Sequence, residues 1–167
     1  LSVGLTPATD LLTGLGLKIH PRTKGPYVNE HNETLIPGIF VAGNGLHVHD
    51  LVDYVTLEAR DAATGAYCYL NNLLHYENKN ILVEAKSGIG YVLPQRINYL
   101  NIDDYFTIKF RVSKPMKNVD IVIKCDNVVI KRIKKLNVIP SEMENIKLSK
   151  DLINNDVNTI TVEVEGL

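Results

Sequence analysis

The chain has 167 residues, enough for one ordinary domain or two small ones. Its hydrophobic fraction of 45% and charged fraction of 22% are typical of a globular protein, and no apolar run reaches the roughly 20 residues that a membrane-spanning helix needs. The formal net charge of -1 gives no electrostatic reason to expect binding to nucleic acid or to an anionic membrane.

The first 76 residues hold all the histidines and most of the glycines. Pro7 favours a short helix over residues 8–15, and residues 17–19 and 26–28 are predicted to form short strands on either side of a turn. The apolar run 39–42 lies between a Pro-Gly pair and a Gly-Asn-Gly turn. This pattern is typical of a buried parallel strand that ends at a glycine turn.

A helix is predicted to follow, from about Asp50 or Asp53 to about Leu74, with either aspartate as its N-cap. Apolar residues recur in it at three- and four-residue spacing, which puts them on one face: Val52, Val55, Ala59, Ala62, Ala63, Ala66, Leu70 and Leu73. Because several of them are alanines, we expect this face to lie close to a sheet or a ligand.

The second half of the chain is rich in Val, Ile, Lys and Asn and shows repeated alternation of apolar and polar residues. It predicts strands at residues 81–85, 91–97, 105–112, 118–124, 128–134, 145–148 and 159–165. Asp126-Asn127 is typical of a tight hairpin turn. We therefore predict an all-β, immunoglobulin-like sandwich over residues 81–167, joined by the polar linker 77–80 to a first domain of residues 1–76.

The strand–turn–helix of the first half has the features of a cofactor site. A glycine lets the backbone approach a ligand closely, and the Asn44 side chain can hydrogen-bond a hydroxyl group. The start of the following helix offers N–H groups and positive potential to an electron-rich atom. On spacing alone, an ordinary turn between a strand and a helix is the better interpretation.

One segment adds more specific information. Residues 34–44 run from a Thr through a Pro-Gly-hydrophobic strand to Ala42-Gly43-Asn44, and this run resembles the second FAD-binding signature of the pyridine-nucleotide-disulfide oxidoreductase superfamily. Upstream, Gly4-Leu5-Thr6-Pro7 with Asp10-Leu11-Leu12 is similar to the passage where that family returns from its NAD(P)-binding insert to the FAD domain. Residues 46–53 and 88–95 resemble a subgroup often encoded beside glycerol-3-phosphate dehydrogenases.

The resemblance implies that residues 1–76 are the last α/β segment of a Rossmann-like FAD/NAD(P)-binding domain. It implies that Gly43 lies against the FAD phosphates and ribityl chain, and that Asn44 replaces the Asp which usually accepts a ribityl hydroxyl. The helix start at Asp53, Tyr54 and Val55 would direct its N–H groups at the flavin pyrimidine edge. No catalytic acid, base or nucleophile is predicted within the chain.

The motifs that the family places upstream are absent from the sequence: it has no GxGxxG for FAD or NAD(P) and no redox CxxC. We therefore interpret the chain as the C-terminal part of a cytoplasmic FAD-dependent oxidoreductase that transfers electrons between a nicotinamide and an unknown acceptor. FAD would be bound by the intact parent, and NAD(P) by its upstream domain. The expected partners are the rest of the parent polypeptide and a partner oxidoreductase subunit, and an oligomer is compatible with this interpretation. The fragment alone is expected to be inactive.

Two other motifs have simpler interpretations. His47-x-His49-Asp50 could share a metal ion, but the other ligands of that half are scattered in sequence, so we predict no metal site. We interpret these histidines as part of a polar loop near the flavin or at a subunit contact. The basic run 131–135 lies on a predicted strand without aromatic neighbours, which favours a solvated sheet edge over a nucleic-acid site.

A second hypothesis assigns the function to the β-rich half. In that case residues 81–167 would be a protein-docking module, and residues 1–76 a vestigial flavin-binding segment. An apolar patch on a sandwich face or on an unpaired edge would favour docking. The flavoenzyme hypothesis instead expects the exposed apolar surface on residues 1–76.

Overall fold

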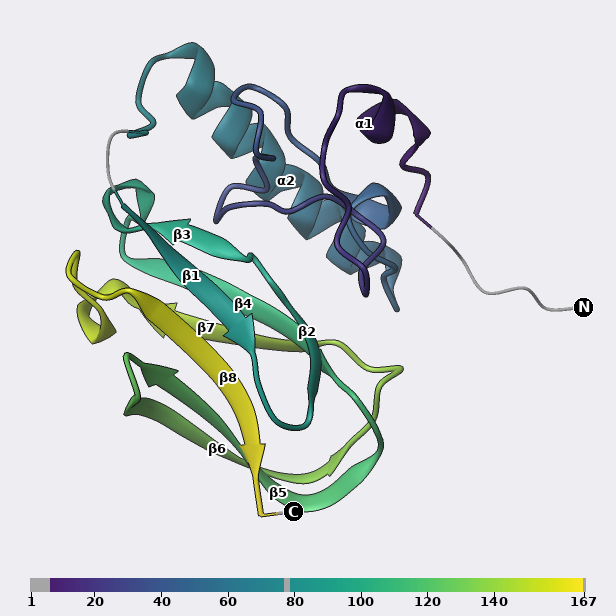
Figure 1. Ribbon diagram of the computed structural model, residues 1–167, viewed down its shortest axis with the longest axis vertical. Coiled ribbons are helices and arrows are strands. Elements are labelled where there is room, and N and C mark those ends of the chain that lie inside the picture. The colour runs from purple at the N-terminus through teal and green to yellow at the C-terminus, as the bar shows by residue number, and fades with distance from the viewer. Residues whose placement is uncertain (1–6, 77–78, 167) are drawn as a thin grey trace, which may run out of the picture. The chain divides into compact units, whose positions relative to one another are not determined.

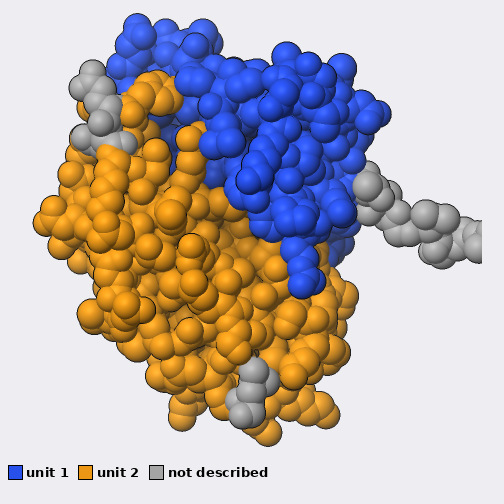
Figure 2. Space-filling view, viewed as in Figure 1, with its two compact units in different colours: residues 1–74 blue, residues 75–167 orange. Residues whose placement is uncertain are grey.

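The computed structural model describes residues 7–76 and 79–166. The chain divides into two compact units, residues 1–74 and residues 75–167, which Figure 2 colours separately. Of the predicted linker, Glu77 and Asn78 lie outside the described residues. The same is true of Gly4, Leu5 and Thr6, which belong to the upstream passage of the family resemblance.

The first unit consists of helices and loops. It contains α1 (Asp10–Gly14), the short 3-10 helix η1 (Gly43–Gly45) and the long helix α2 (Val52–Leu70). Between them the backbone pairs at two isolated antiparallel bridges, Ile19 with Pro26 and Glu33 with Phe40. In Figure 1 the loop that carries the bridge of Glu33 with Phe40 runs beside α2.

The prediction of a Rossmann-like α/β segment is wrong. Residues 39–42 do not form a parallel strand: Phe40 makes one antiparallel bridge, and the backbone around it closes a loop through the hydrogen bonds from Thr34 N–H to the Ile39 carbonyl and from Val41 N–H to the Asn32 carbonyl. The described part of this unit supplies no neighbouring parallel strand. A run of four apolar residues does not distinguish a buried strand from a half-buried loop, because both need apolar side chains.

Within the first unit, helix α2 packs closely against a loop and not against a sheet. Only Glu58, Ala62 and Gly65 of this helix are buried. A Cβ atom on Gly65 would lie 2.7 Å from His31 Cβ and 2.8 Å from Phe40 Cε1, so the glycine permits the close approach. Most of the predicted apolar face, including Val52 and Leu70, is exposed.

The second unit contains eight strands, which form two sheets (Figure 1). The order in the larger sheet is β3-β1-β8-β5-β6, and in the smaller sheet β2-β4-β7. The strands are β1 (Asn80–Ala85), β2 (Ile89–Leu93), β3 (Arg96–Asn98), β4 (Tyr105–Val112), β5 (Met116–Cys125), β6 (Val128–Val138), β7 (Glu144–Ser149) and β8 (Thr159–Glu165). The predicted strand at 91–97 is divided in two, with a cis peptide bond between Leu93 and Pro94.

Alternating side chains of both sheets enclose one hydrophobic core. In β4, Phe106, Ile108 and Phe110 are buried, while the residues between them are partly exposed. Strands β5 and β6 form a hairpin at Asp126-Asn127, whose positive φ angles of 43° and 73° are those of a tight type I′ turn. The β-rich character of this half is therefore confirmed.

The prediction of an immunoglobulin-like sandwich is contradicted by the strand order of the two sheets. The first strand, β1, pairs in parallel with the last strand, β8, and β3 forms an edge beside β1. In the immunoglobulin order, strands A-B-E-D form one sheet and C-F-G the other. Alternation along a strand identifies its buried face, but it carries no information on which strands become neighbours.

We expect Phe110→Ala to destabilise the second unit by about 3–5 kcal/mol, because it leaves a cavity in a core where Phe110 has no exposed surface. Denaturant unfolding followed by far-UV circular dichroism measures the effect. The matched control is Leu136→Ala on β6, where the side chain is 78% exposed and a change within about 0.5 kcal/mol is expected. Equal losses for the two variants would contradict this core.

Burial raises the pKa of the Cys125 thiol to about 11 from 9.0, and the negative charge of Asp126 acts in the same direction. The unfolded chain therefore releases this proton at lower pH than the folded chain. Folding stability from this group is fully present below about pH 9 and is lost as the pH rises toward about 11. We expect Cys125→Val to remove part of the alkaline loss of stability, measured as unfolding free energy at pH 8 and pH 10.

Candidate functional site

The Gly-Asn-Gly turn lies against α2 in the structure. Gly43 is buried and has a φ of +65°, a conformation that side chains other than glycine rarely adopt. A Cβ atom at this position would lie 3.1 Å from Val55 Cγ1 in the second turn of α2. The glycine is therefore required both by its backbone angle and by the space beside the helix.

The carboxylate of Glu58 joins this turn to two histidines. Glu58 has no exposed surface, and its Oε2 accepts a hydrogen bond of 2.8 Å from the Gly43 N–H. His47 Nε2 lies 3.0 Å from Glu58 Oε1, and His49 Nε2 lies 2.8 Å from Oε2. The imidazole rings are 4.2 Å apart between centroids and tilted by 49°. We refer to His47, His49 and Glu58 as the His-Glu cluster.

Several backbone contacts hold the loop that carries the cluster. The N–H groups of Leu46 and His47 both donate to the Gly43 carbonyl, which closes η1. The Asn44 side chain accepts a hydrogen bond of 3.3 Å from the His49 N–H. From the other side, Asn32 Nδ2 donates to the Glu58 carbonyl at 3.2 Å. The positions of both imidazoles are therefore set by the turn and by the helix together.

The cluster satisfies the electrostatic requirement of a buried carboxylate. A carboxylate removed from water is costly unless donors surround it, and here one amide and two imidazole nitrogens do so. Its side chains can also share a proton or bind a metal ion. His Nε2 and carboxylate oxygens accept protons, and both are common metal ligands. Among the described residues, these three are the group whose ligand atoms lie close enough together, within 4.8 Å, to hold one ion.

The residues predicted to contact the cofactor lie in different environments. Gly43 and Val55 are brought together, whereas Asn44 and Asp53 are exposed and Tyr54 is half-buried. No side chain caps the first turn of α2, and its N-cap residue is Leu51, not an aspartate. Sequence reasoning missed Glu58. The signal was a carboxylate within an alanine-rich helix, at a position that could face inward.

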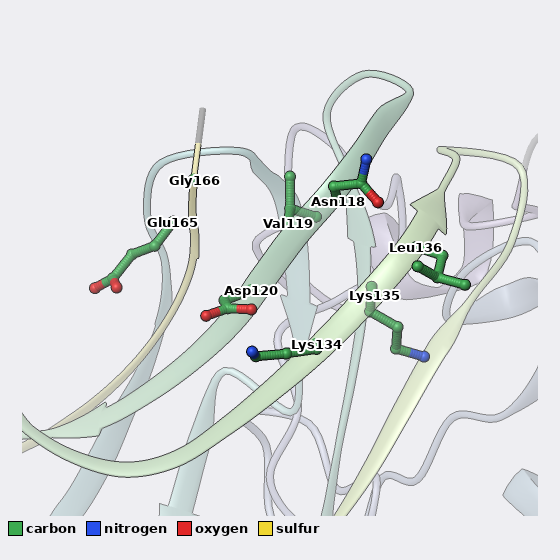
Figure 3. A pocket seen from close by; sticks show the side chains of 8 residues that line it. All are labelled: Asn118, Val119, Asp120, Lys134, Lys135, Leu136, Glu165 and Gly166. Carbon is green, nitrogen blue, oxygen red and sulfur yellow. The ribbon is translucent and has the colours of Figure 1, made fainter.

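The second unit has a surface hollow at the edge of its larger sheet, shown in Figure 3. It is lined by residues of β5, β6 and the end of β8: Asn118, Val119, Asp120, Lys134, Lys135, Leu136, Glu165 and Gly166. Arg132 Nη1 binds both Asp120 and Glu165, at 3.1 and 2.7 Å, and Lys135 Nζ binds Glu144 at 2.7 Å. Because its lining mixes acidic and basic side chains, and Asp120, Glu165 and Lys135 are ion-paired, this hollow does not favour a charged ligand.

Comparisons with protein-family models, with curated proteins and with solved structures find no match to the chain. No helix among residues 7–76 and 79–166 is long and apolar enough to cross a membrane.

We expect Glu58→Ala to destabilise the first unit by about 3–5 kcal/mol, because the Gly43 amide and two imidazoles lose their buried partner. The hydrogen exchange rate of the Gly43 amide should rise by a factor that corresponds to a similar free energy. This rate reports the contact directly. Arg60→Ala, an exposed change on the same helix, is the control and should leave this amide protected. Unchanged exchange in Glu58→Ala would show that the carboxylate does not hold the turn.

Proposed function

We propose that this chain is the C-terminal part of an FAD-dependent oxidoreductase, in which the Gly43-Asn44 turn and the start of α2 form one wall of the flavin site. The parent enzyme would transfer electrons between a nicotinamide cofactor and an acceptor, in the cytoplasm. The chain itself contributes binding and orientation. The redox chemistry belongs to the flavin, and no residue of the chain is assigned a catalytic step.

The observation that carries the proposal is the conformation of Gly43. Its positive φ and the absence of a Cβ let the turn lie against Val55, and the next residue, Asn44, is exposed, where its side chain can meet a hydroxyl group. Glu58 fixes the same backbone from inside the unit through the Gly43 N–H. A turn held in this way is preorganised for a ligand, and it occurs in the segment that resembles an FAD-binding signature.

The exposed apolar surface of the first unit also supports the proposal. Leu51 and Val52, at the start of α2, are 56% and 76% exposed, and Leu70 at its end is 77% exposed. A 19-residue helix with three buried positions leaves most of its surface without a partner among the described residues. This is the distribution expected if a cofactor and a further part of the parent polypeptide cover the helix.

Exposed apolar side chains on β6 favour a second candidate, the protein-docking module. Val128, Val129 and Leu136 are exposed on this strand, which forms an edge of the larger sheet. The same strand carries Lys131, Arg132, Lys134 and Lys135, and charged side chains along an edge discourage pairing with another strand. The flavin proposal is therefore the stronger of the two.

The proposal predicts that the native gene product, expressed from its own start codon, is yellow and contains one flavin per chain. Gly43→Ala should reduce flavin content by tenfold or more, because a Cβ is strained at this φ and crowds Val55. Gly14→Ala is the matched control, since a Cβ there meets no atom within 4 Å. A colourless native product would sink the proposal and favour the docking module.

A gain of affinity gives a second test that does not depend on disruption. In the native gene product, Asn44→Asp would restore the residue usual in the family, and a charged acceptor binds a ribityl hydroxyl more strongly than an amide does. We expect flavin to dissociate about tenfold more slowly from this variant, which corresponds to about 1.4 kcal/mol of binding free energy. Faster dissociation would contradict the contact assigned to Asn44.

A further inference from the structure

We propose that the His-Glu cluster is a binding site for one divalent first-row transition-metal ion, with Zn²⁺ as the best fit. His47 Nε2, His49 Nε2 and a Glu58 carboxylate oxygen would be the ligands. This inference is independent of flavin binding. It also revises the interpretation of the two histidines, because the ligand that the sequence did not reveal is supplied by α2.

The separations between the ligand atoms suit such an ion. Four ligands at about 2.0–2.1 Å from a tetrahedral Zn²⁺ are about 3.3 Å from one another. The two histidine nitrogens lie 3.0 and 2.8 Å from the two carboxylate oxygens, one each, and the ligand atoms of the three residues lie within 4.8 Å of one another. Movements of about 1.5 Å or less therefore bring any pair to the tetrahedral separation. Without an ion these contacts are hydrogen bonds. When an ion is bound, the Nε2 atom of each imidazole presents a lone pair to it. The imidazole proton is then on Nδ1 or has been released.

The residue types indicate the class of ion. Two imidazoles and one carboxylate suit Zn²⁺, Co²⁺ or Fe²⁺, whereas Ca²⁺ and Mg²⁺ prefer sites made of oxygen ligands alone. The ion would also offset the negative charge of a carboxylate that has no contact with water. Three protein ligands leave a fourth position for water or for an exogenous ligand.

The surroundings of the cluster are those of an ordered site. The Gly43 N–H donates to Glu58 Oε2, and such outer contacts orient a metal-ligating carboxylate. His49 is held through its own N–H by Asn44 Oδ1. The side chains of His47, His49 and Glu58 are 1%, 4% and 0% exposed. Ligands fixed by both a loop and a helix lose little freedom when the ion binds.

The test is a titration of the chelator-treated 167-residue chain with Co²⁺, followed by its visible d–d absorption and by competition with Zn²⁺. We expect one equivalent to bind and Zn²⁺ to displace it. His49→Asn and Glu58→Gln should weaken binding by more than the roughly 10–100-fold that loss of an outer contact causes. His75→Asn, an exposed histidine outside the cluster, should bind as the unmodified chain does.

A second measurement needs no variant and covers the case in which a substitution unfolds the protein. In the Co²⁺-loaded unmodified chain, paramagnetic shifts should appear on the imidazole protons of His47 and His49. Shifts on His20, His31 or His75 instead would overturn the proposal. So would the absence of Co²⁺ binding, or unchanged binding in folded His49→Asn and Glu58→Gln variants.

Discussion

The first unit depends on one buried carboxylate. Glu58 lies on α2 without exposed surface, and the hydrogen bonds that it accepts reach the Gly43 backbone and two imidazoles on the following loop. Such a group is stable only while its donors stay in place, so helix, turn and loop constrain one another. This constraint explains how a segment without a sheet can hold a glycine turn in one conformation.

The same constraint connects the two proposals. The preorganised turn presents the side chain of Asn44 outward, where the proposed flavin would lie. Inward, the turn places His47 and His49 on the carboxylate, where the proposed metal ion would bind. The proposed metal ligands are not the proposed flavin contacts, but Asn44 Oδ1, which accepts from the His49 N–H, links the two sites. Each proposal nevertheless stands or fails by its own experiment.

Sequence reasoning succeeded where a local pattern determines the structure. Alternation of apolar and polar residues predicted the strand at 105–112, which is β4, and Asp126-Asn127 marked the hairpin between β5 and β6 correctly. It failed where the structure depends on which segments of the chain become neighbours in the fold. The apolar run 39–42 has the composition of a parallel strand, but in the described residues Phe40 finds only Glu33 opposite it. The parallel pairing of β1 with β8 joins residues far apart in sequence and leaves no local signal.

For the candidate site, the turn could be predicted and the cluster could not. Gly43 and Asn44 stand out through their position after an apolar run, whereas Glu58 is one acidic residue among several on a helix. Its role appears only when α2 is packed against the loop. The predicted helix face was likewise misjudged, because small residues fit a buried face and an exposed one equally well.

The most direct test of the central claim is a crystal structure of the native gene product purified with its own cofactor. We expect FAD with its phosphates or ribityl chain in van der Waals contact with Gly43, and a ribityl hydroxyl within hydrogen-bonding distance of Asn44 Oδ1. A flavin bound away from residues 43–55, or a native product without flavin, would contradict it.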